Sequence, residues 1–296
     1  MHVRTAAVAA LTVASIVATA CTGSSSTAPP SASASAAITY DKVDVGGYQL
    51  AYECVGEGSP TIIAEAGYNT GGTTTFAGML QPLAATTRVC TYDRAGTGNS
   101  DDRPKTPGLT SEDQAAELQT LLETAGIQPP YVLMAHSYGG FVARLFAADH
   151  RDEVAGMILI ESSHEDEILP YRRYYGNSAD GDWVDGGDLL DIDATARALR
   201  AKARDFGAIP LIVIRAAVYE DVLSPALWRR TQADLASLSS DSVEVEALGS
   251  GHFVMDDNPA VVVAAADAVV AAVRSGGGLP ACAEIFGAVD ARCLQG

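Results

Sequence analysis

The chain has 296 residues, and 37 acidic against 19 basic residues give it a formal net charge of −18. Nucleic-acid binding depends on clustered Lys and Arg that neutralise phosphates, and no such basic patch is visible, so we expect no nucleic-acid partner. The excess of acidic residues is instead interpreted as a contribution to solubility.

Residues 1–20 have the composition of a bacterial export signal. A short basic region containing Arg4 precedes an apolar run over residues 6–20, which is too short to span a bilayer. The run ends at Cys21 and resembles a lipoprotein signal in which that cysteine is lipidated, although Ala18 stands where such signals usually have leucine. Simple cleavage before the cysteine is the alternative. We therefore expect an exported protein that is either a membrane-anchored lipoprotein on the outer side of the bacterial cell membrane or secreted.

Residues 21–37 are predicted to form a flexible tether. After Cys21 the segment contains Ser, Thr, Ala, Pro and Gly and no charged residue. Such a composition cannot bury enough apolar surface to offset its ordering entropy. The folded domain is expected to begin near Ile38, and the remaining length suits one large α/β domain.

The first part of the domain is predicted to begin with a β-hairpin, because two segments of alternating polarity flank Gly46 and Gly47. Two apolar runs then predict buried strands. A helix follows, with Thr110 as its N-cap, Asp113 completing a capping box and Gly126 at its end. These elements are strands over 38–45, 48–55, 61–68 and 88–93 and a helix over 111–125.

The central stretch of the domain places a serine in a sharp turn. The apolar run Tyr131–Met134 predicts a buried strand, and after Ser137 the sequence continues at helical spacing. Ala135 and Gly139, two residues on either side of the serine, are small enough for the strand and the helix to cross. This context is that of a nucleophile elbow, and it places the backbone N–H of Tyr138 beside the serine oxygen.

The second part of the domain continues the alternation of strands and helices. Strands are predicted over 154–161, 209–215 and 242–248, and helices over 228–238 and 259–274. The last strand alternates in polarity as an exposed edge strand would, and Asn258 is the expected N-cap of the last helix. The alternation predicts a parallel sheet covered on both faces, with functional sites at the carboxyl ends of its strands.

Residues 162–207 interrupt this alternation, and we interpret them as a short helical lid with its helix over 194–204. Its aromatic residues suggest an apolar entrance or packing within the lid: Tyr171, Tyr174, Tyr175 and Trp183. Its spaced aspartates fit no EF-hand loop, so we expect a solvated loop rather than a calcium site: Asp182, Asp185, Asp188, Asp191 and Asp193.

Five cysteines remain to be assigned. If Cys21 is the lipid site, four are left in an oxidising compartment, where disulfides form and persist. The four allow three pairings, among which the sequence alone does not choose. The absence of a C-x-x-C spacing argues against a zinc site. These four residues are Cys54, Cys90, Cys282 and Cys293.

Three motifs in order give the chain a resemblance to a known family. They are the serine elbow, a D-R-x-G-x-G-x-S loop over 93–100 and an S-G-H-F loop over 250–253. With these motifs, residues 38–275 resemble the α/β-hydrolase family. The resemblance implies an α/β-hydrolase fold, with a mostly parallel eight-stranded sheet flanked by helices and the lid at 162–207. Residues 276–296 would be a C-terminal tail outside the core.

The resemblance also implies a disulfide pairing. In the family's sheet order the second strand lies beside the fourth, so a bridge between Cys54 and Cys90 is expected. Cys282 and Cys293 would then staple the C-terminal tail. A small loop closed in this way contributes about 2–3 kcal/mol if it is unstrained.

The family carries a catalytic triad, and the matching positions supply its serine and histidine. Ser137 is the expected nucleophile, and a base must take its proton because a hydroxyl is a poor nucleophile at neutral pH. His252, in a glycine-flanked loop after the last strand, is the expected base. His164 is the runner-up, and His136, adjacent to the serine, is expected to point away.

The acid of the triad has two candidates. Many family members carry it shortly after the strand that ends here near Arg215, but the matching slot near Val218 is apolar, and Asp221 lies beyond it. Others, haloalkane dehalogenases among them, carry it at the end of the strand after the elbow helix, which is Glu161 here. We favour Glu161, which can accept the Nδ1–H of His252.

The oxyanion hole would use two backbone N–H groups, those of Tyr138 and Tyr68. Tyr68 lies in the loop after the third strand, where the family often has His-Gly and this chain has Ala66-Gly67. Asp93 and Arg94 are expected to brace that region through charge-assisted hydrogen bonds rather than to act in catalysis.

The resemblance implies an exported serine hydrolase that cleaves carboxylic esters through an acyl-enzyme. A peptidase or amidase using the same triad is the alternative among enzymes, and a catalytically weak ligand-binding receptor is the alternative outside them. The expected partner is a small-molecule ester or amide. No metal, organic cofactor or protein partner is indicated.

Overall fold

The computed structural model describes residues 40–105, 107–170, 183–219 and 224–294. Several features of the sequence lie outside these ranges: the predicted export signal, Cys21, the tether, Tyr171, Tyr174, Tyr175, Asp182 and Asp221. None of the helices that the structure describes is long and apolar enough to cross a bilayer.

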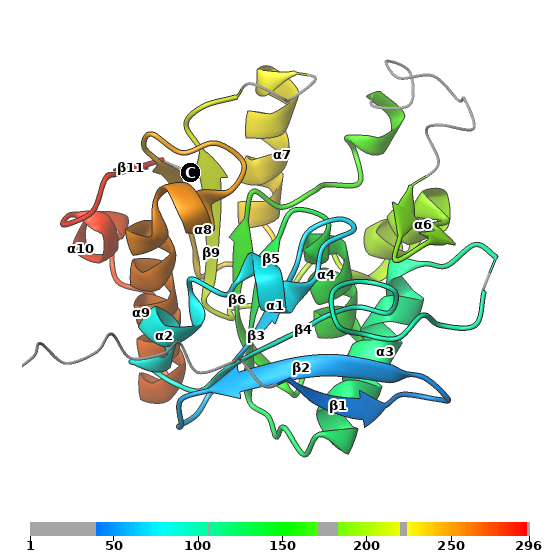
Figure 1. Cartoon of the computed structure of the whole chain (residues 1–296). Helices are drawn as coiled ribbons and strands as arrows, with labels where there is room; N and C mark the ends of the chain where they lie inside the picture. The colour runs from blue at the N-terminus through cyan, green and yellow to red at the C-terminus, as the bar shows by residue number, and fades with distance from the viewer. Residues whose placement is uncertain (1–39, 106, 171–182, 220–223, 295–296) are drawn as a thin grey trace, which may run out of the picture. The chain divides into compact units, whose positions relative to one another are not determined.

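Nine of the described strands form one sheet in the order β1-β2-β4-β3-β5-β6-β9-β10-β11 (Figure 1). From β4 to β10 in this order, neighbouring strands are parallel, whereas β1–β2, β2–β4 and β10–β11 are antiparallel. The strands are β1 (Asp41–Asp44), β2 (Gln49–Val55), β3 (Thr61–Glu65), β4 (Val89–Tyr92), β5 (Tyr131–His136), β6 (Val154–Ile160), β9 (Leu211–Ala216), β10 (Ser242–Ala247) and β11 (Ala291–Cys293).

Helices cover both faces of this sheet and create two hydrophobic cores. The first core contains side chains of α3, α4 and α6, and the second contains side chains of α2, α8 and α9. Strand residues alternate between the two, as Leu133 and Met134 of β5 do. The helices are α1 (Gly72–Thr75), α2 (Leu80–Ala84), α3 (Ser111–Thr124), α4 (Gly139–Asp149), α6 (Ile192–Lys202), α7 (Pro225–Ala236), α8 (Val254–Asp257), α9 (Pro259–Ser275) and α10 (Cys282–Phe286).

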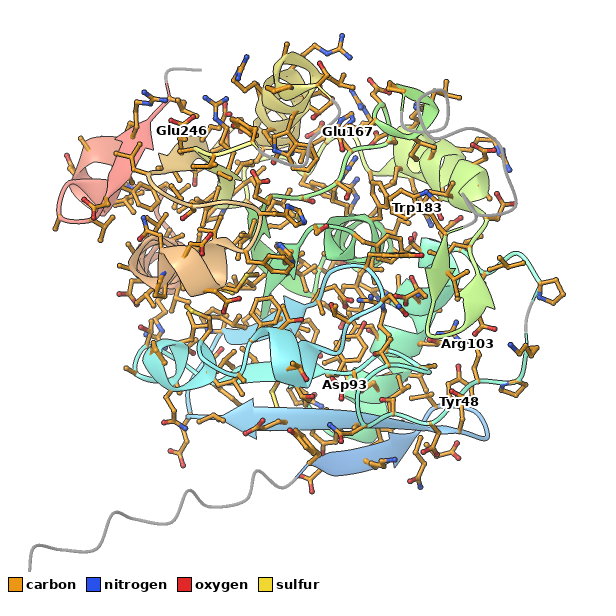
Figure 2. The ribbon with its side chains drawn as sticks, turned by 45° about the horizontal axis from the view of Figure 1, so that its top comes forward. Tyr48, Asp93, Arg103, Glu167, Trp183 and Glu246 are labelled. Atoms are coloured by element: carbon orange, nitrogen blue, oxygen red, sulfur yellow. A yellow bond between two sulfur atoms is a disulfide. The ribbon has the colours of Figure 1, made fainter. Side chains whose placement is uncertain are left out.

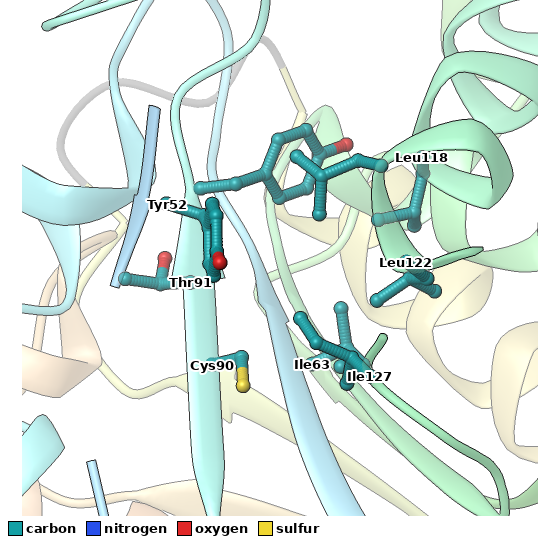
Figure 3. Close-up of a pocket in the computed structure, with 9 residues that line it drawn as sticks. Tyr52, Ile63, Cys90, Thr91, Leu118, Leu122 and Ile127 are labelled. Carbon is teal, nitrogen blue, oxygen red and sulfur yellow. The ribbon is translucent and has the colours of Figure 1, made fainter. Parts of the chain in front are cut away.

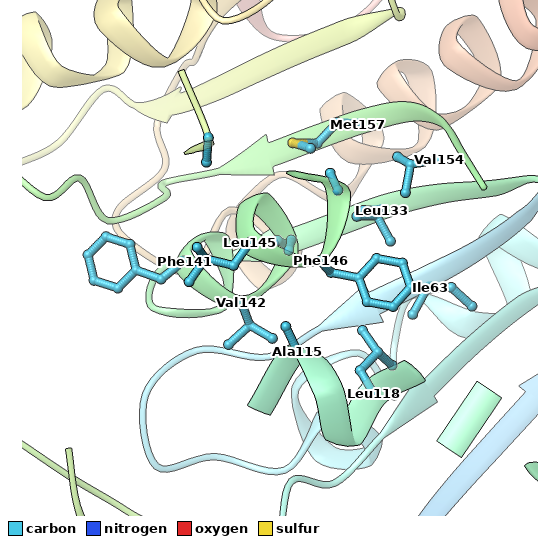
Figure 4. Close-up of a cluster of buried hydrophobic side chains, with 14 of the residues drawn as sticks. Ile63, Ala115, Leu118, Leu133, Phe141, Val142, Leu145, Phe146, Val154 and Met157 are labelled. Atoms are coloured by element: carbon cyan, nitrogen blue, oxygen red, sulfur yellow. The ribbon is translucent and has the colours of Figure 1, made fainter. Parts of the chain in front are cut away.

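Helix α4, which follows the central serine, is buried along most of its length. Phe141, Val142, Leu145 and Phe146 are at most 1% exposed. Figure 4 shows these side chains among those of α3, β5 and β6. Burying each such side chain contributes roughly 1.5–3 kcal/mol, so the start of α4 is held firmly against the sheet.

The predicted start and end of α3 are confirmed. The Thr110 side chain accepts from the Asp113 amide, and the Asp113 carboxylate accepts from the Thr110 amide, which is a capping box. Gly126, just past the helix, has a φ of 65°, a left-handed conformation that glycine adopts without strain.

The C-terminal tail departs from the expectation. The sequence predicts eight strands in the sheet, with 242–248 as the edge strand and residues 276–296 outside it. Instead, β11 pairs with β10 and adds a ninth strand. The polar side chains that suggested an edge are paired, Glu244 with Arg215 and Glu246 with both Arg215 and Arg292. Ion pairing therefore accounts for the alternating pattern.

Asn258 also has a different role from the one predicted. It occupies the N-cap position of α9, but its side chain makes no capping hydrogen bond. Its Nδ2 donates instead to the carbonyl oxygens of Leu248 and Asp290, at 3.3 and 2.8 Å. The side chain therefore joins the loop after β10 to the tail.

The described part of the lid insertion contains a hairpin and a helix. Strands β7 (Val184–Asp185) and β8 (Asp188–Leu189) form the hairpin, and α6 follows it. The expectation of a solvated acidic loop is wrong for Asp185 and Asp188, because both are buried against arginine side chains. Ion pairing, which the spacing of the aspartates does not reveal, explains the difference.

Both expected disulfides are present in the structure. Cys54 and Cys90 are bonded across directly paired positions of β2 and β4, and Cys282 is bonded to Cys293 between α10 and β11. Figure 3 shows a small pocket beside Cys90, lined mainly by apolar side chains of the sheet and α3. It is too tight to hold a water molecule, so it belongs to the core.

Candidate active site

Ser137 lies in a strained turn between β5 and α4. Its φ of 53° lies in the left-handed region, which non-glycine residues rarely adopt. A Cβ atom placed on Gly139 would lie 2.5 Å from the Ala66 carbonyl oxygen, and one on Gly140 would lie 1.6 Å from Ser162 Oγ. Only glycine fits at these two positions. The expected strand, strained serine and helix are therefore all present.

His252 and Glu161 form a pair at the same edge of the sheet. The Nδ1 atom of His252 lies 3.3 Å from Glu161 Oε2, and the two side chains are 37% and 2% exposed. The other carboxylate oxygen, Oε1, accepts from the backbone N–H of Ala216 at 2.6 Å and from Trp228 Nε1 at 3.0 Å. Glu161 is thus fixed by neutral donors on one side and faces the histidine on the other.

His136 lies against His252. Its Nε2 is 2.9 Å from the His252 carbonyl oxygen, and the two ring centroids are 4.7 Å apart. Burial, together with the charge of nearby His252, lowers the pKa of His136 to about 3. The ring is therefore neutral near pH 7 and can donate its Nε2–H to that carbonyl. The expectation that His136 points away from the site is wrong in this respect, because it supports the loop that carries His252.

The loop after β3 passes close to the serine. A Cβ atom placed on Gly67 would lie 3.4 Å from Ser137 Cβ. The rings of Tyr68 and Tyr138 are in edge contact, with centroids 6.2 Å apart. Within the described ranges, neither Tyr68 nor Tyr138 donates its backbone N–H to a protein acceptor. Among the residues described, both N–H groups therefore remain without a protein acceptor, as oxyanion donors require.

Arg94 and Asp93 brace this region, as the sequence analysis expects. Asp93 accepts from the backbone and hydroxyl of Thr73 and from the backbone of Asn99. Arg94 is buried and donates to the Glu65 carboxylate and to the carbonyl oxygens of Ala66 and Gly67. Two strand ends are thereby tied together through charge-assisted bonds.

The runner-up histidine is engaged elsewhere. His164 Nε2 lies 2.8 Å from Asp234 Oδ2, and its Nδ1 accepts from the Asp166 amide at 3.1 Å. Burial lowers the pKa of His164. Both ring nitrogens are used in holding the start of the insertion, so neither is free to serve as a base.

Three supporting residues were not recognised from the sequence. Trp228 was assigned only to a helix, His136 was expected to point away, and Asp185 was assigned to solvent. Each acts through a partner far away in the chain, so no local motif marks it. Among the described residues, no group of three or more His, Cys, Asp or Glu side chains could hold a metal ion.

Comparisons with known proteins agree with this architecture. Residues 63–186 match the family model described as alpha/beta hydrolase fold. The uncharacterized protein YqjL of Bacillus subtilis is 27% identical over 213 residues, which is 70% of this chain and 82% of that protein. The chain therefore has the α/β-hydrolase fold, as the family-model match and the structural neighbours indicate.

Solved structures share the fold at lower identity. A thermophilic esterase from Thermogutta terrifontis is 21% identical, with a TM-score of 0.55 over 81% of this chain and 98% of that one. The enol-lactonase from Burkholderia xenovorans LB400 is 19% identical, with a TM-score of 0.55 over 75% of this chain and 96% of that one. At such identities the likeness concerns the fold.

Proposed function

We propose that this chain is an exported serine hydrolase that cleaves carboxylic esters through an acyl-enzyme. The observation that carries the proposal is the strained conformation of Ser137, on a turn shared by β5 and α4. The His252–Glu161 pair at the same edge of the sheet supports it. Strain of this kind persists only where the surrounding structure enforces it, and it concentrates at functional sites.

In the proposed reaction, Ser137 Oγ attacks the ester carbonyl carbon while His252 takes the hydroxyl proton. Glu161 accepts the Nδ1–H of His252 and stabilises the imidazolium. The backbone N–H groups of Tyr68 and Tyr138 bind the oxyanion. His252 then gives the proton to the leaving alcohol. Water attacks the acyl-enzyme by the same route, releasing the carboxylic acid and restoring the serine.

Two observations favour esters. The structural neighbours include an esterase and an enol-lactonase. Three large apolar side chains are exposed in segments that follow strands β3, β9 and β10, namely Tyr68, Val218 and Phe253. These side chains can receive an apolar acyl or alcohol group. A serine nucleophile is not compatible with the dehalogenase reaction, which needs a carboxylate nucleophile.

Export is supported by the cysteine chemistry. Two disulfides, Cys54–Cys90 and Cys282–Cys293, are characteristic of proteins that work in an oxidising compartment. Cys21 and the signal before it remain a proposal from the sequence. Mass analysis of the mature N-terminus would distinguish a lipid-modified Cys21 from an unmodified, secreted product.

The decisive experiment is hydrolysis of p-nitrophenyl esters of increasing chain length, with Ser137→Ala as the control. We expect turnover by the wild type and at least a 10⁴-fold loss in the variant. Fluorophosphonate labelling of Ser137 would confirm the activated serine independently. Labelling without ester turnover would favour the amidase alternative. Absence of both would favour the receptor.

A further inference from the structure

Asp185 of hairpin strand β7 is fully buried and makes four hydrogen bonds. It accepts two hydrogen bonds from Arg94, from Nε at 2.7 Å and from Nη2 at 2.9 Å. It accepts two more, from the backbone N–H of Asn69 at 2.7 Å and from Gln114 Nε2 at 2.8 Å. Burial alone would raise the pKa of Asp185, but Arg94 and these donors hold it below its ordinary value. The carboxylate is therefore charged at neutral pH.

Arg94, the ion-pair partner of Asp185, also binds the peptide that carries the Tyr68 N–H. Arg94 Nη2 donates to the Gly67 carbonyl oxygen at 2.6 Å, and Nη1 donates to the Ala66 carbonyl oxygen at 2.9 Å. In a planar trans peptide the carbonyl and the following N–H point in opposite directions. Holding the Gly67 oxygen toward Arg94 therefore directs the N–H of Tyr68 to the other side of the peptide.

Gln114, which also binds Asp185, contacts Tyr138, the other proposed donor. Gln114 accepts from the Tyr138 hydroxyl at 2.6 Å while its amide donates to Asp185. The guanidinium carbon of Arg94 lies 5.3 Å from the centroid of the Tyr138 ring. One buried carboxylate is thus linked to both residues whose amides would form the oxyanion hole.

Other residues of the hairpin also contact Tyr68 and its neighbour Asn69. The Val184 amide donates to the Tyr68 hydroxyl at 2.6 Å, and the Gly186 amide donates to Asn69 Oδ1 at 3.2 Å. The Trp183 ring lies in edge contact with Tyr68, with centroids 5.3 Å apart. Trp183 and Arg103 are labelled beside the hairpin in Figure 2.

From this geometry we infer that Asp185, through Arg94 and Gln114, is a positioning residue for the oxyanion hole. The inference rests on the proposed function. The hairpin at 183–189 then has a role beyond covering the strand ends, because it holds the Gly67–Tyr68 peptide and the side chain of Tyr138. A buried ion pair far from the serine in the chain thereby contributes to stabilising the transition state.

Asp185→Asn tests this role with almost no change in shape. The new side-chain NH₂ group replaces one of the two carboxylate oxygens and then faces other donors. At one position these are Arg94 and Gln114, and at the other they are Arg94 and the backbone N–H of Asn69. Loss of one oxyanion donor costs about 10²–10³ in kcat, and partial misplacement costs less. We expect kcat for p-nitrophenyl esters to fall about 10–100-fold, with KM changed less than about twofold.

Asp188→Asn is the matched control. Asp188 is the cross-strand partner of Asp185 in the same hairpin and is also buried in an ion pair, with Arg103 Nε at 3.2 Å. Its partner, Arg103, is paired with Glu117 of α3 and makes none of the contacts with residues 66–69. We expect Asp188→Asn to keep the wild-type kcat, even if its melting temperature falls by as much as that of Asp185→Asn.

A trifluoromethyl ketone separates positioning from general destabilisation. Its adduct with serine carries an oxyanion, whereas a substrate-like amide that is not cleaved does not. For Asp185→Asn, we expect the inhibition constant of the ketone to rise by the same factor as kcat/KM falls, while that of the amide stays constant. Gln114→Met, which leaves the ion pair intact, should show the same pattern with a several-fold effect.

Three results would overturn the inference. The first is a folded Asp185→Asn protein with the same kcat and ketone inhibition as Asp188→Asn. The second is equal weakening of ketone and amide binding. If Asp185→Asn does not fold, the third such result is a Gln114→Met protein whose kcat and ketone inhibition are unchanged. A wild type without Ser137-dependent fluorophosphonate labelling would instead refute the proposed function, and the inference with it.

Discussion

The two sides of Ser137 are held in place by different kinds of interaction. On the acid–base side, Glu161 is fixed by the Ala216 amide and the Trp228 indole, both neutral, and His252 is partly exposed. On the oxyanion side, Arg94 is buried between Glu65 and Asp185.

The difference matches what each side would do in the proposed reaction. A histidine that moves a proton must change its charge, which partial exposure and a single facing carboxylate permit. Amides that bind an oxyanion must keep a fixed direction, and a buried ionic network resists reorientation. Changes on the acid–base side should therefore affect turnover more than stability, and changes on the oxyanion side should affect both.

The largest effect is expected for Glu161→Gln. The amide cannot stabilise the imidazolium, and its nitrogen can present a donor to His252 Nδ1, so kcat should fall about 10³–10⁴-fold. Steady-state kinetics with p-nitrophenyl esters measure this, with a thermal melt as the control for folding. A variant that keeps more than a tenth of wild-type kcat would transfer the role of the acid to Asp221, for which Asp221→Asn is the matched test.

Arg94→Met should produce the largest loss of stability. It leaves Glu65 and Asp185 buried without their cationic partner, and breaking a buried pair in this way costs about 3–5 kcal/mol. Urea denaturation measures the change. Lys42→Met, at an exposed ion pair with Asp101, is the control and should change the free energy of unfolding by less than about 1 kcal/mol. Equal effects would refute the contrast between buried and exposed pairs.

Glu167, buried beside Thr231 of α7, makes the stability of the fold depend on pH. Burial raises the pKa of Glu167 to about 8, while the hydrogen bond from Thr231 opposes the shift. Between the ordinary pKa of 4.5 and about 8, the folded state binds a proton that the unfolded state has lost, so stability falls as pH rises through this interval.

Glu167→Gln removes this titration while imitating the protonated acid. At pH 5 the variant should be about as stable as the wild type, and by pH 9 it should be more stable by about 2–4 kcal/mol. Urea titrations at pH 5, 7 and 9 measure the difference. A difference that does not grow with pH would show that Glu167 is not protonated in the folded state.

The smallest effect on turnover is expected for Trp228→Phe. An aromatic ring is retained, but Glu161 Oε1 loses one of its two neutral donors, and a hydrogen bond to a charged group contributes about 1.5–3 kcal/mol. Because the Ala216 amide remains, we expect kcat to fall about tenfold. An unchanged kcat and pH profile would mean that the Ala216 amide alone orients the carboxylate.

Local patterns in the sequence were sufficient for the framework of the protein. The apolar run before Ser137 predicted β5, and the Thr110–Asp113 capping box predicted the start of α3, because both depend on residues close together in the chain. Small residues around the serine predicted the elbow, in which Gly139 does lie close to the backbone of Ala66. The resemblance to the family supplied the disulfide pairing that the cysteine spacing left open.

Partnerships over long sequence separations were decided only by the tertiary structure. Asp185 and Arg94 are 91 residues apart, and nothing near either residue indicates that they meet. The same holds for Trp228 with Glu161 and for β11, which turns the predicted edge strand β10 into an internal one. A charged residue in a sequence carries no sign of its burial, because burial depends on a partner that only the fold brings near. The sequence therefore determined the central strands and helices, and the fold determined the added strands and which charges meet in the interior.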